Sequence, residues 1–296
     1  MSAPDEAIPP EMDRMLDDIR RGIAGSDPGL LAAFELYREE ARFGRMLIGP
    51  ELRRLQPGAR ILEIGAGSLM LSCALQREGY QVTALEPIGR GFSHFAGLQQ
   101  AVLDHARQDG VMPAVIRCSA EALDIGDRFE FAFSVNVMEH VDDVSRVLAA
   151  AYRALKAGGV YRFICPNYAF PYEPHFNLPT LFSRSLTEMV FRRRILSSRT
   201  IADPDAVWSS LNWITVAQVR RICRRELALK PVFRGDIFEF FLDRALSDAS
   251  FQSRRGPLIT KFIGRLRRLG LLRLTRLIPV AFLPVMDCAI MRAREA

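Results

Sequence analysis

The sequence predicts an α/β fold in which helices cover both faces of a mostly parallel sheet. From residue 60 onward, short apolar runs alternate with longer amphipathic stretches, as strands do when crossover helices join them. The short runs are apolar throughout, which is typical of strands buried on both faces. The expected strands are 60–65, 80–86, 113–118, 129–135 and 159–165, and the expected helices are 68–79, 92–109 and 143–155.

The segments on either side of this alternation complete the expected organisation. Residues 1–29 are polar and contain several prolines, so we expect a flexible N-terminal segment with a short helix from Glu11 to Arg21, which Gly25, Ser26, Asp27 and Pro28 interrupt. Residues 30–296 form one expected domain, with a core at 55–165, an insertion after the fifth strand at 166–210 and a C-terminal part at 211–296. Further elements are expected as helices within 30–55, a helix at 213–230, a strand at 231–234, a basic amphipathic helix at 254–277 and a strand near 285–292.

Charge is divided unevenly along the chain. Residues 1–183 carry 18 basic and 24 acidic side chains, whereas residues 184–296 carry 22 and 10, so the two parts have net charges of −6 and +12. Such a C-terminal excess fits contact with an anionic phospholipid surface, a phosphorylated substrate or nucleic acid, or a solvated arginine-rich face. Nucleic acid ranks below lipid because the sequence contains no zinc knuckle or RNP signature.

Cysteine and histidine usage bounds the location and the chemistry. The five cysteines are scattered without a CxxC spacing, which argues against a disulfide framework and favours a reducing cytoplasm. The acidic, proline-containing N-terminus does not resemble a secretory signal. No histidine or carboxylate cluster has recognisable metal-ligand spacing, so we expect no bound metal.

The most informative local motif is ILEIGAGSLMLSCAL at residues 61–75, an apolar strand, a glycine loop and a helix. Gly65 and Gly67, on either side of Ala66, allow a tight turn and a close approach to a ligand. Glu63 is placed to accept hydrogen bonds from a cationic amino group. A dinucleotide fingerprint would have glycine or alanine at position 70, where this sequence has Met70, and an acidic residue before the loop suits a pyrophosphate poorly.

The next acidic residue supports an adenosine-containing ligand. Glu86 lies about twenty residues after the glycine loop, at the end of the second expected strand. A carboxylate at that position accepts hydrogen bonds from ribose hydroxyls. Because S-adenosylmethionine (SAM) and nicotinamide dinucleotides both contain this ribose, Glu86 does not distinguish between them.

These blocks, followed by CSAEAL at 118–123 and FEFAFSVNVMEHVDDVSRVLAAAYRALKAGGVYRF at 129–163, resemble the class I SAM-dependent methyltransferases, especially those that methylate small molecules and lipid intermediates. The resemblance implies a Rossmann-like SAM-methyltransferase fold and SAM as cofactor. It also implies cofactor-binding residues around the methionine part, the ribose and the adenine of SAM. They are Glu63, Gly65, Ala66, Gly67, Glu86, Ser119, Ala120, Glu121 and Asn136. Ser119 departs from the family pattern, since many relatives have an aspartate there, so adenine binding is expected to differ.

Candidate catalytic residues follow the fourth and fifth strands. His140, beside Glu139, is either a general base or a residue that orders its loop. The stretch CPNYAFPYEPHFNLP at 165–179 concentrates polar and aromatic groups where acceptor-binding insertions occur, and it contributes Tyr172 and His175 as candidates. The alternative is a surface loop packed by its aromatic residues.

The sequence therefore predicts an enzyme that transfers a methyl group from SAM to an O, N or C atom of a small or amphiphilic, lipid-like acceptor. The basic helix at 254–277 either packs on the domain or contacts an anionic membrane, which would make a cytoplasmic protein peripherally membrane-associated. Two other functions remain open. One is a non-catalytic SAM-fold module that binds a membrane or a partner, and the other is an NAD-dependent oxidoreductase.

Overall fold

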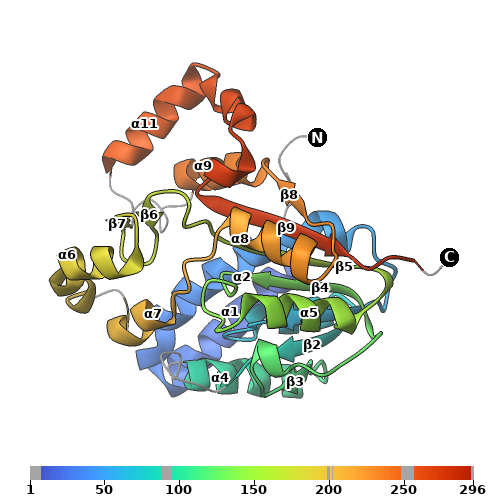
Figure 1. The fold of residues 1–296 in the computed structure, drawn as a ribbon. Helices are drawn as coiled ribbons and strands as arrows, with labels where there is room; N and C mark the ends of the chain where they lie inside the picture. The colour runs from blue at the N-terminus through green and yellow to red at the C-terminus, as the bar shows by residue number, and fades with distance from the viewer. Residues whose placement is uncertain (1–7, 88–94, 199–200, 202, 248–256, 295–296) are drawn as a thin grey trace. The chain divides into compact units, whose positions relative to one another are not determined.

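The structure is a computed structural model that describes residues 8–87, 95–198, 201, 203–247 and 257–294. Within these residues, seven strands form one sheet in the order β3-β2-β1-β4-β5-β9-β8, and a separate hairpin pairs β6 with β7 (Figure 1). The strands β1 to β4 pair in parallel, whereas β8 and β9 pair antiparallel. The mostly parallel α/β fold expected from the alternation is therefore confirmed.

The strands lie close to their expected positions. The sheet strands are β1 (Arg60–Ile64), β2 (Gln81–Leu85), β3 (Ala114–Ile116), β4 (Phe129–Val135), β5 (Leu155–Pro166), β8 (Val232–Arg234) and β9 (Val285–Met291), and the hairpin strands are β6 (Tyr172–Glu173) and β7 (Leu178–Pro179). The main difference is β5, which begins at Leu155 instead of residue 159. The N-terminal part of β5 includes Gly158 and Gly159, which form backbone hydrogen bonds with Arg292 just after β9.

The helices also follow the sequence pattern. They are α1 (Pro10–Ser26), α2 (Leu31–Leu52), α3 (Met70–Arg77), α4 (Phe95–Gln108), α5 (Val144–Ala154), α6 (Arg184–Leu196), α7 (Pro204–Ser210), α8 (Val216–Arg221), α9 (Ile237–Ser247) and α11 (Pro257–Arg268). The helix expected at 213–230 is shorter, because α8 passes into a π-helical turn at Ile222–Glu226. The beginnings of the helices expected at 92 and 254 lie outside the described residues.

The chain divides into two compact units. Unit A comprises the described parts of Pro4–Val137, Val141–Arg162 and Ile290–Ala296, and unit B comprises those of Met138–His140 and Phe163–Ala289. Strands β5 and β9 belong to both units. The insertion expected at 166–210 and most of the C-terminal part fall together in unit B. The single methyltransferase domain expected for 30–296 remains a prediction.

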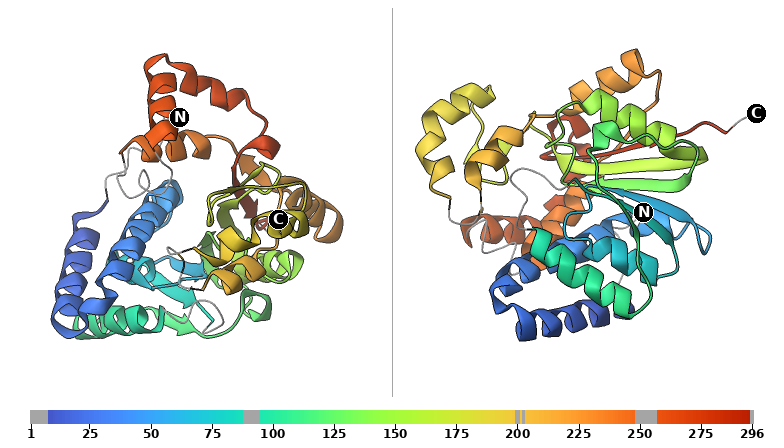
Figure 2. Two further views of the ribbon diagram at one scale, coloured as in Figure 1. Left: turned by 90° about the vertical axis from the view of Figure 1, so that its left-hand side faces the viewer. Right: turned by 90° about the horizontal axis from the view of Figure 1, so that it is seen from below.

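The short helix expected at 11–21 is present as α1, but it extends over Pro10–Ser26 and is packed against the rest of unit A. Helix α1 places five apolar side chains, Met12, Met15, Leu16, Ile19 and Ile23, in the core of unit A. Their i, i+3, i+4 and i+7 spacing gives the helix one apolar face. That face packs against α2, α3 and α4, and Figure 2 shows α1 and α2 side by side. The prolines, which suggested disorder, stand before the helix and at its first position, where proline is tolerated.

The basic amphipathic helix packs partly within unit B. Helices α9 and α11 are neighbours (Figure 1). Ile263 of α11 is buried and contacts Phe241, Leu242 and Leu246 of α9 and Leu272 after α11. Packing on the protein therefore accounts for this part of its apolar face. Among the described residues, no helix is both long and apolar enough to cross a membrane.

Candidate active site

The glycine loop of unit A lies at a topological switch point of the sheet. Strand β1 pairs with β2 on one side and with β4 on the other, so the chain order reverses between β1 and β4. In open α/β sheets, ligands bind at the carboxyl ends of the strands beside such a point. The loops that leave these two ends begin at Gly65 and at Asn136.

The backbone at both strand ends has an unusual conformation. Gly65 has a φ of 74°, and a Cβ atom on it would lie 2.3 Å from Cγ2 of Val137. Gly67 and Asn136 also have positive φ values, which glycine and asparagine tolerate best. The N–H groups of Gly65 and Ala66 both donate to the Leu85 carbonyl, which ties this loop to the end of β2. Glycine is therefore required at position 65 by close packing as well as by its dihedral angles.

Two buried carboxyl groups flank the glycine loop. Glu63 accepts a hydrogen bond from Ser72 Oγ, and burial raises the pKa of Glu63 to about 8. Oε2 of Glu86 accepts from the Gly67 N–H at 2.8 Å. Burial also raises the pKa of Glu86, although the Gly67 hydrogen bond and the charge of Arg117 act in the opposite direction.

The segment expected at the adenine lies in a short 3-10 turn, Ala120–Ala122. Ala120 is buried, whereas Ser119 is exposed. Oε1 of Glu121 accepts from the backbone N–H of Asp142 at 2.9 Å. Glu121 therefore orders the loop before α5.

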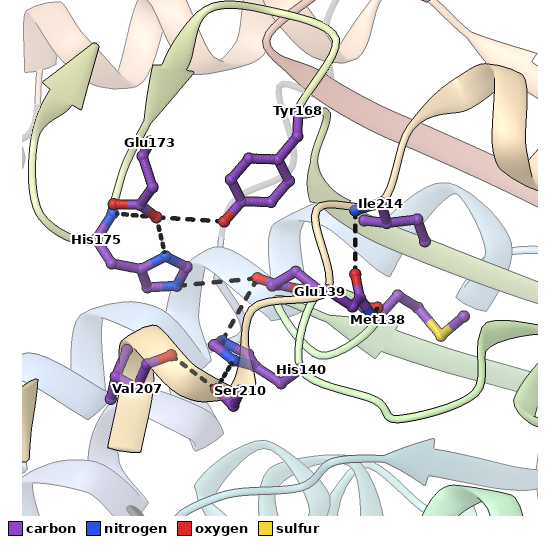
Figure 3. Close-up of polar contacts among 10 residues, drawn as sticks. Met138, Glu139, His140, Tyr168, Glu173, His175, Val207, Ser210 and Ile214 are labelled. Carbon is purple, nitrogen blue, oxygen red and sulfur yellow. Dashed lines mark hydrogen bonds and ion pairs between the residues drawn. The ribbon is translucent and has the colours of Figure 1, made fainter. Parts of the chain in front are cut away.

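In unit B, the residues after β4 meet those of the insertion in a polar cluster (Figure 3). Glu139, His140 and His175 each offer a ligand or proton-accepting atom, and these atoms all lie within 4.8 Å of one another. The two imidazole centroids are 5.1 Å apart. The structure therefore brings together two of the three expected catalytic candidates, which are 35 positions apart in the sequence.

Glu173 orients His175. Its Oε1 atom lies 2.6 Å from His175 Nδ1 and accepts from the Tyr168 hydroxyl at 3.2 Å. The side-chain hydrogen bond from His175 and the backbone N–H of Phe176 outweigh burial and lower the pKa of Glu173. An ionised Glu173 accepts the proton on Nδ1, so the lone pair of a neutral His175 lies on Nε2.

A serine performs the same task for His140. Ser210 Oγ donates its proton to the Val207 carbonyl at 2.8 Å and lies 2.7 Å from His140 Nδ1. The Ser210 hydroxyl proton is already donated to Val207, so Nδ1 of His140 donates to Ser210 Oγ. Nε2 of His140 therefore carries the lone pair. Burial is the larger cause that lowers the pKa of His140, and the charge of His175 lowers it further, to about 3. The imidazole of His140 is therefore neutral at pH 7.

Glu139 lies between the two imidazoles. Its Oε1 atom is 3.9 Å from Nε2 of His140 and 4.0 Å from Nε2 of His175. The side chain is fully buried, and neither carboxylate oxygen has a hydrogen-bond partner among the described residues. Burial raises the pKa of Glu139 to about 7, against the lowering effect of His175.

A cavity of about 470 Å³ adjoins this cluster through Tyr168. The ring of Tyr168 stacks on Trp213, with centroids 5.2 Å apart, and its hydroxyl reaches Glu173. The lining is mainly aromatic and apolar, and it consists of Tyr168, Ala169, Pro171, Thr180, Leu181, Phe182 and Trp213. Such a cavity suits an apolar or aromatic ligand with a polar group directed at the tyrosine.

The third catalytic candidate, Tyr172, lies elsewhere in the hairpin. Its hydroxyl donates to Asn177 Oδ1, whereas the tyrosine that reaches Glu173 is Tyr168. Sequence reasoning also missed Ser210 and Trp213. Only their nearness in the fold relates them to His140 and Tyr168. The stretch at 165–179, which the sequence singled out for its polar and aromatic groups, contributes Tyr168, Glu173 and His175 to the cluster.

Comparisons with known proteins bear on this geometry. A family model described as a methyltransferase domain matches residues 62–163. A protein of Mycobacterium tuberculosis with no described activity is 40% identical over 276 residues, 93% of each chain. A ubiquinone biosynthesis O-methyltransferase of Paramagnetospirillum magneticum is 37% identical over 132 residues, which cover 44% of this chain and 48% of that protein. The structure of geranyl diphosphate C-methyltransferase from Streptomyces coelicolor has a TM-score of 0.50 and 13% identity, covering 88% of this chain and 77% of that one.

Residues 62–163 belong to the methyltransferase domain family, and the chain has the fold of SAM-dependent methyltransferases. SAM is accordingly the cofactor of this methyltransferase. The NAD-dependent oxidoreductase considered above is set aside, since the family model covers the glycine loop and the long block through β5.

Proposed function

We propose that this methyltransferase transfers a methyl group from SAM to a hydroxyl oxygen of an amphiphilic acceptor. The observation that supports it best is the Glu173–His175 pair, in which a buried carboxylate fixes the imidazole with its lone pair on Nε2, beside an aromatic cavity. Hydroxyl oxygens need a proton acceptor during methyl transfer, whereas a thiolate or a stabilised carbanion needs less help. A residue that accepts a proton therefore favours an oxygen acceptor.

The residues around the glycine loop fit the cofactor. Glu63 would accept from the cationic amino group, Glu86 would bind the ribose, and Gly65, Ala66 and Gly67 would leave room for the methionine part. Both carboxyl groups are buried beside the glycine loop, and the positive φ values of Gly65 and Gly67 form its tight turn. Ser119, Ala120 and Glu121 would lie near the adenine, and Asn136 near the methionine end. When bound, SAM supplies an electrophilic methyl group on a sulfonium.

Asn136, expected near the methionine end of SAM, lies close in the chain to Glu139 of the polar cluster. Only two residues, Val137 and Met138, separate Asn136 from Glu139. At ~3.6 Å per residue, the Cα atoms of Asn136 and Glu139 cannot be more than about 11 Å apart. His175 Nε2 takes up the hydroxyl proton, and the Glu173 carboxylate stabilises the imidazolium that results. Positioning and exclusion of water supply the rest of the catalysis.

The cavity favours an acceptor with an apolar part. Trp213, Leu181 and Phe182 offer apolar surface, and Tyr168, which also lines the cavity, connects it with Glu173. The partial relatives whose names describe an O-methyltransferase of ubiquinone biosynthesis support an oxygen acceptor on a lipid-like molecule. The substrate class is therefore a prenylated or alkylated phenol or enol.

The first experiment measures cofactor binding and turnover separately. Calorimetry with SAM, S-adenosylhomocysteine and NAD should give micromolar binding for the first two alone. Radiolabelled SAM is then offered with alkyl phenols and with matched amines and thiols. We expect methylation of the phenols. Binding of SAM without turnover on any of them would favour a non-catalytic SAM-fold module.

His175→Ala tests the proton acceptor. Removal of a general base costs ~10²- to 10⁴-fold in kcat, whereas SAM affinity should not change. His105→Ala is the matched control, because His105 belongs to α4 of unit A and pairs with Asp109. Full activity of His175→Ala would remove this histidine from the mechanism.

We propose an anionic membrane surface as a second partner. After α11, several large apolar side chains are exposed near exposed basic ones. The apolar group is Leu269, Leu271, Leu274, Leu277, Ile278 and Phe282, and the basic group is Lys261, Arg265, Arg267 and Arg268. Apolar side chains with adjacent arginines are typical of surfaces that insert into the headgroup region.

All five cysteines are free, which supports the expected cytoplasmic location.

A further inference from the structure

Three electron-pair donors converge in the cluster shown in Figure 3. The Glu139 carboxylate and one nitrogen each of His140 and His175 lie within 4.8 Å of one another. Hydrogen bonds to Ser210 and Glu173 hold the protons of the two rings on Nδ1, so that both Nε2 atoms carry lone pairs. The atoms that approach one another are therefore all acceptors.

Glu139 is the least satisfied member of the cluster. Its side chain is fully buried, and neither oxygen has a hydrogen-bond partner among the described residues. Buried carboxylates are normally paired, hydrogen-bonded or bound to a metal, because a bare one loses its hydration without compensation. Separations of 3.9 and 4.0 Å between Oε1 and the two Nε2 atoms are too long for direct hydrogen bonds. The arrangement lacks a positive charge at its centre.

We propose that Glu139, His140 and His175 bind one divalent transition-metal cation, with Zn²⁺ as the best match. Two histidines and one glutamate form a ligand set of catalytic zinc sites, in which a fourth position remains open. Ligands about 2.1 Å from zinc at a tetrahedral angle are about 3.4 Å apart. The two separations between Glu139 Oε1 and the imidazole nitrogens would need to shrink by about half an ångström, and the two histidine nitrogens lie within 4.8 Å of one another.

The surroundings match those of a metal site. Histidine ligands almost always donate their other ring N–H to a carboxylate, carbonyl or other polar group, which fixes the ring and its tautomer. Glu173 has this position behind His175, and Ser210 has it behind His140. The Val207 carbonyl in turn orients Ser210. Both rings thus have the outer partners that a metal ligand requires.

This inference rests on the proposed function and deepens it. A cation with an open position would bind the hydroxyl oxygen of the acceptor and lower its pKa. While the cation is bound, Nε2 of His175 would be a ligand and could not accept a proton. The cation would instead lower the pKa of the hydroxyl, so that the oxygen releases its proton to water before methyl transfer. Loss of turnover in a His175 variant fits both cases, so the test must measure metal binding directly.

The test is calorimetry of the full chain, freed of metal by a chelator, titrated with ZnCl₂ and separately with MgCl₂. We expect one Zn²⁺ per chain and much weaker Mg²⁺ binding, because Mg²⁺ prefers oxygen ligands. Anomalous diffraction at the zinc absorption edge should place the ion between Glu139 and the two histidines. No acceptor or turnover is needed, so failure of this proposal is distinguishable from failure of the proposed function.

Variants locate the ion. Glu139→Gln, His140→Gln and His175→Gln should each weaken Zn²⁺ binding more than 100-fold, and Glu173→Gln, which changes only the orienting partner, about 10- to 100-fold. His105→Gln is the matched control and should bind like the unchanged protein. Thermal unfolding and SAM affinity report the fold of each variant, and any one folded ligand variant decides the matter. No zinc binding by the unchanged protein, or equal binding by that variant, would overturn the proposal.

Discussion

Glu63 is a fully buried carboxyl group, and its environment differs from that of an exposed glutamate. Burial raises its pKa from 4.5 to about 8, partly offset by the hydrogen bond from Ser72 and reinforced by the nearby Glu86. In the unfolded chain the same group ionises near pH 4.5. Between these two values the folded protein holds a proton that the unfolded chain has released, so stability falls as pH rises.

Glu63→Gln should remove this pH dependence, because glutamine resembles the protonated acid. The free energy of unfolding of the variant, relative to the unchanged protein, should rise by on the order of 3 kcal/mol between pH 6 and pH 9. Urea unfolding at the two pH values measures it, with the exposed Glu11→Gln as control for the change of charge. A difference that is constant with pH would mean that Glu63 is ionised throughout.

At the residue scale, the sequence predicted local backbone geometry, and Gly65 has the positive φ of a tight turn after a strand. The roles of the buried Glu63 and Glu86 in binding SAM remain predictions. Ser210 was missed because it acts from α7, 70 positions after His140. For the same reason, chain spacing gave no sign of the ligand set formed by Glu139, His140 and His175, which is completed only by the fold.

At the scale of elements, the junction of β1 and β4 depends on one glycine. Gly65 and Gly58 have nearly the same dihedral angle, with φ values of 74° and 76°. A Cβ on Gly65 would meet Val137, whereas one on Gly58 would meet nothing within 4 Å. Substitution of Gly58 therefore reports the cost of backbone strain alone, whereas substitution of Gly65 adds the cost of steric overlap with Val137.

Gly58→Ala should cost about 1–2 kcal/mol of stability, the strain of a left-handed residue. Gly65→Ala should cost about 1–3 kcal/mol more, because the added methyl group overlaps Val137, and it should also weaken SAM binding. Urea unfolding and calorimetry measure the two effects. Adding Val137→Ala should restore part of the loss. Equal costs for both alanine variants would argue against the close approach of the two strand ends.

Elements were predictable where the hydrophobic period was unbroken. Strand β4 spans Phe129–Val135, as expected, because alternating phenylalanines mark one of its faces. Helix α8 was expected to be longer, since apolar spacing does not reveal the π-helical turn at Ile222–Glu226. Helix α1 was underestimated because its prolines were weighed above its five core-facing side chains.

On the scale of the whole molecule, composition and fold contribute different parts of the membrane proposal. The excess of arginine after residue 183 was visible in the sequence, as was the apolar face of the helix expected at 254–277. The division into two units was not, because it depends on contacts between distant segments. Because Ile263 packs on α9, part of the apolar face of α11 is not available to a membrane. The membrane proposal therefore rests on the exposed leucines that follow α11.

Vesicle binding tests that surface. The protein should sediment with vesicles that contain phosphatidylserine and not with pure phosphatidylcholine, and the binding should weaken with salt, because the arginines act through a screened field. Leu274 and Leu277 are 54% and 77% exposed, so insertion would bury both. At ~1.5 kcal/mol or more for each leucine buried, Leu274→Ser with Leu277→Ser should weaken binding at least tenfold. Met189→Ser with Val190→Ser, at exposed positions of α6, is the matched control. Equal binding by both double variants would mean that these leucines do not contact a membrane, and equal binding to both lipids would mean that the arginines do not select an anionic surface.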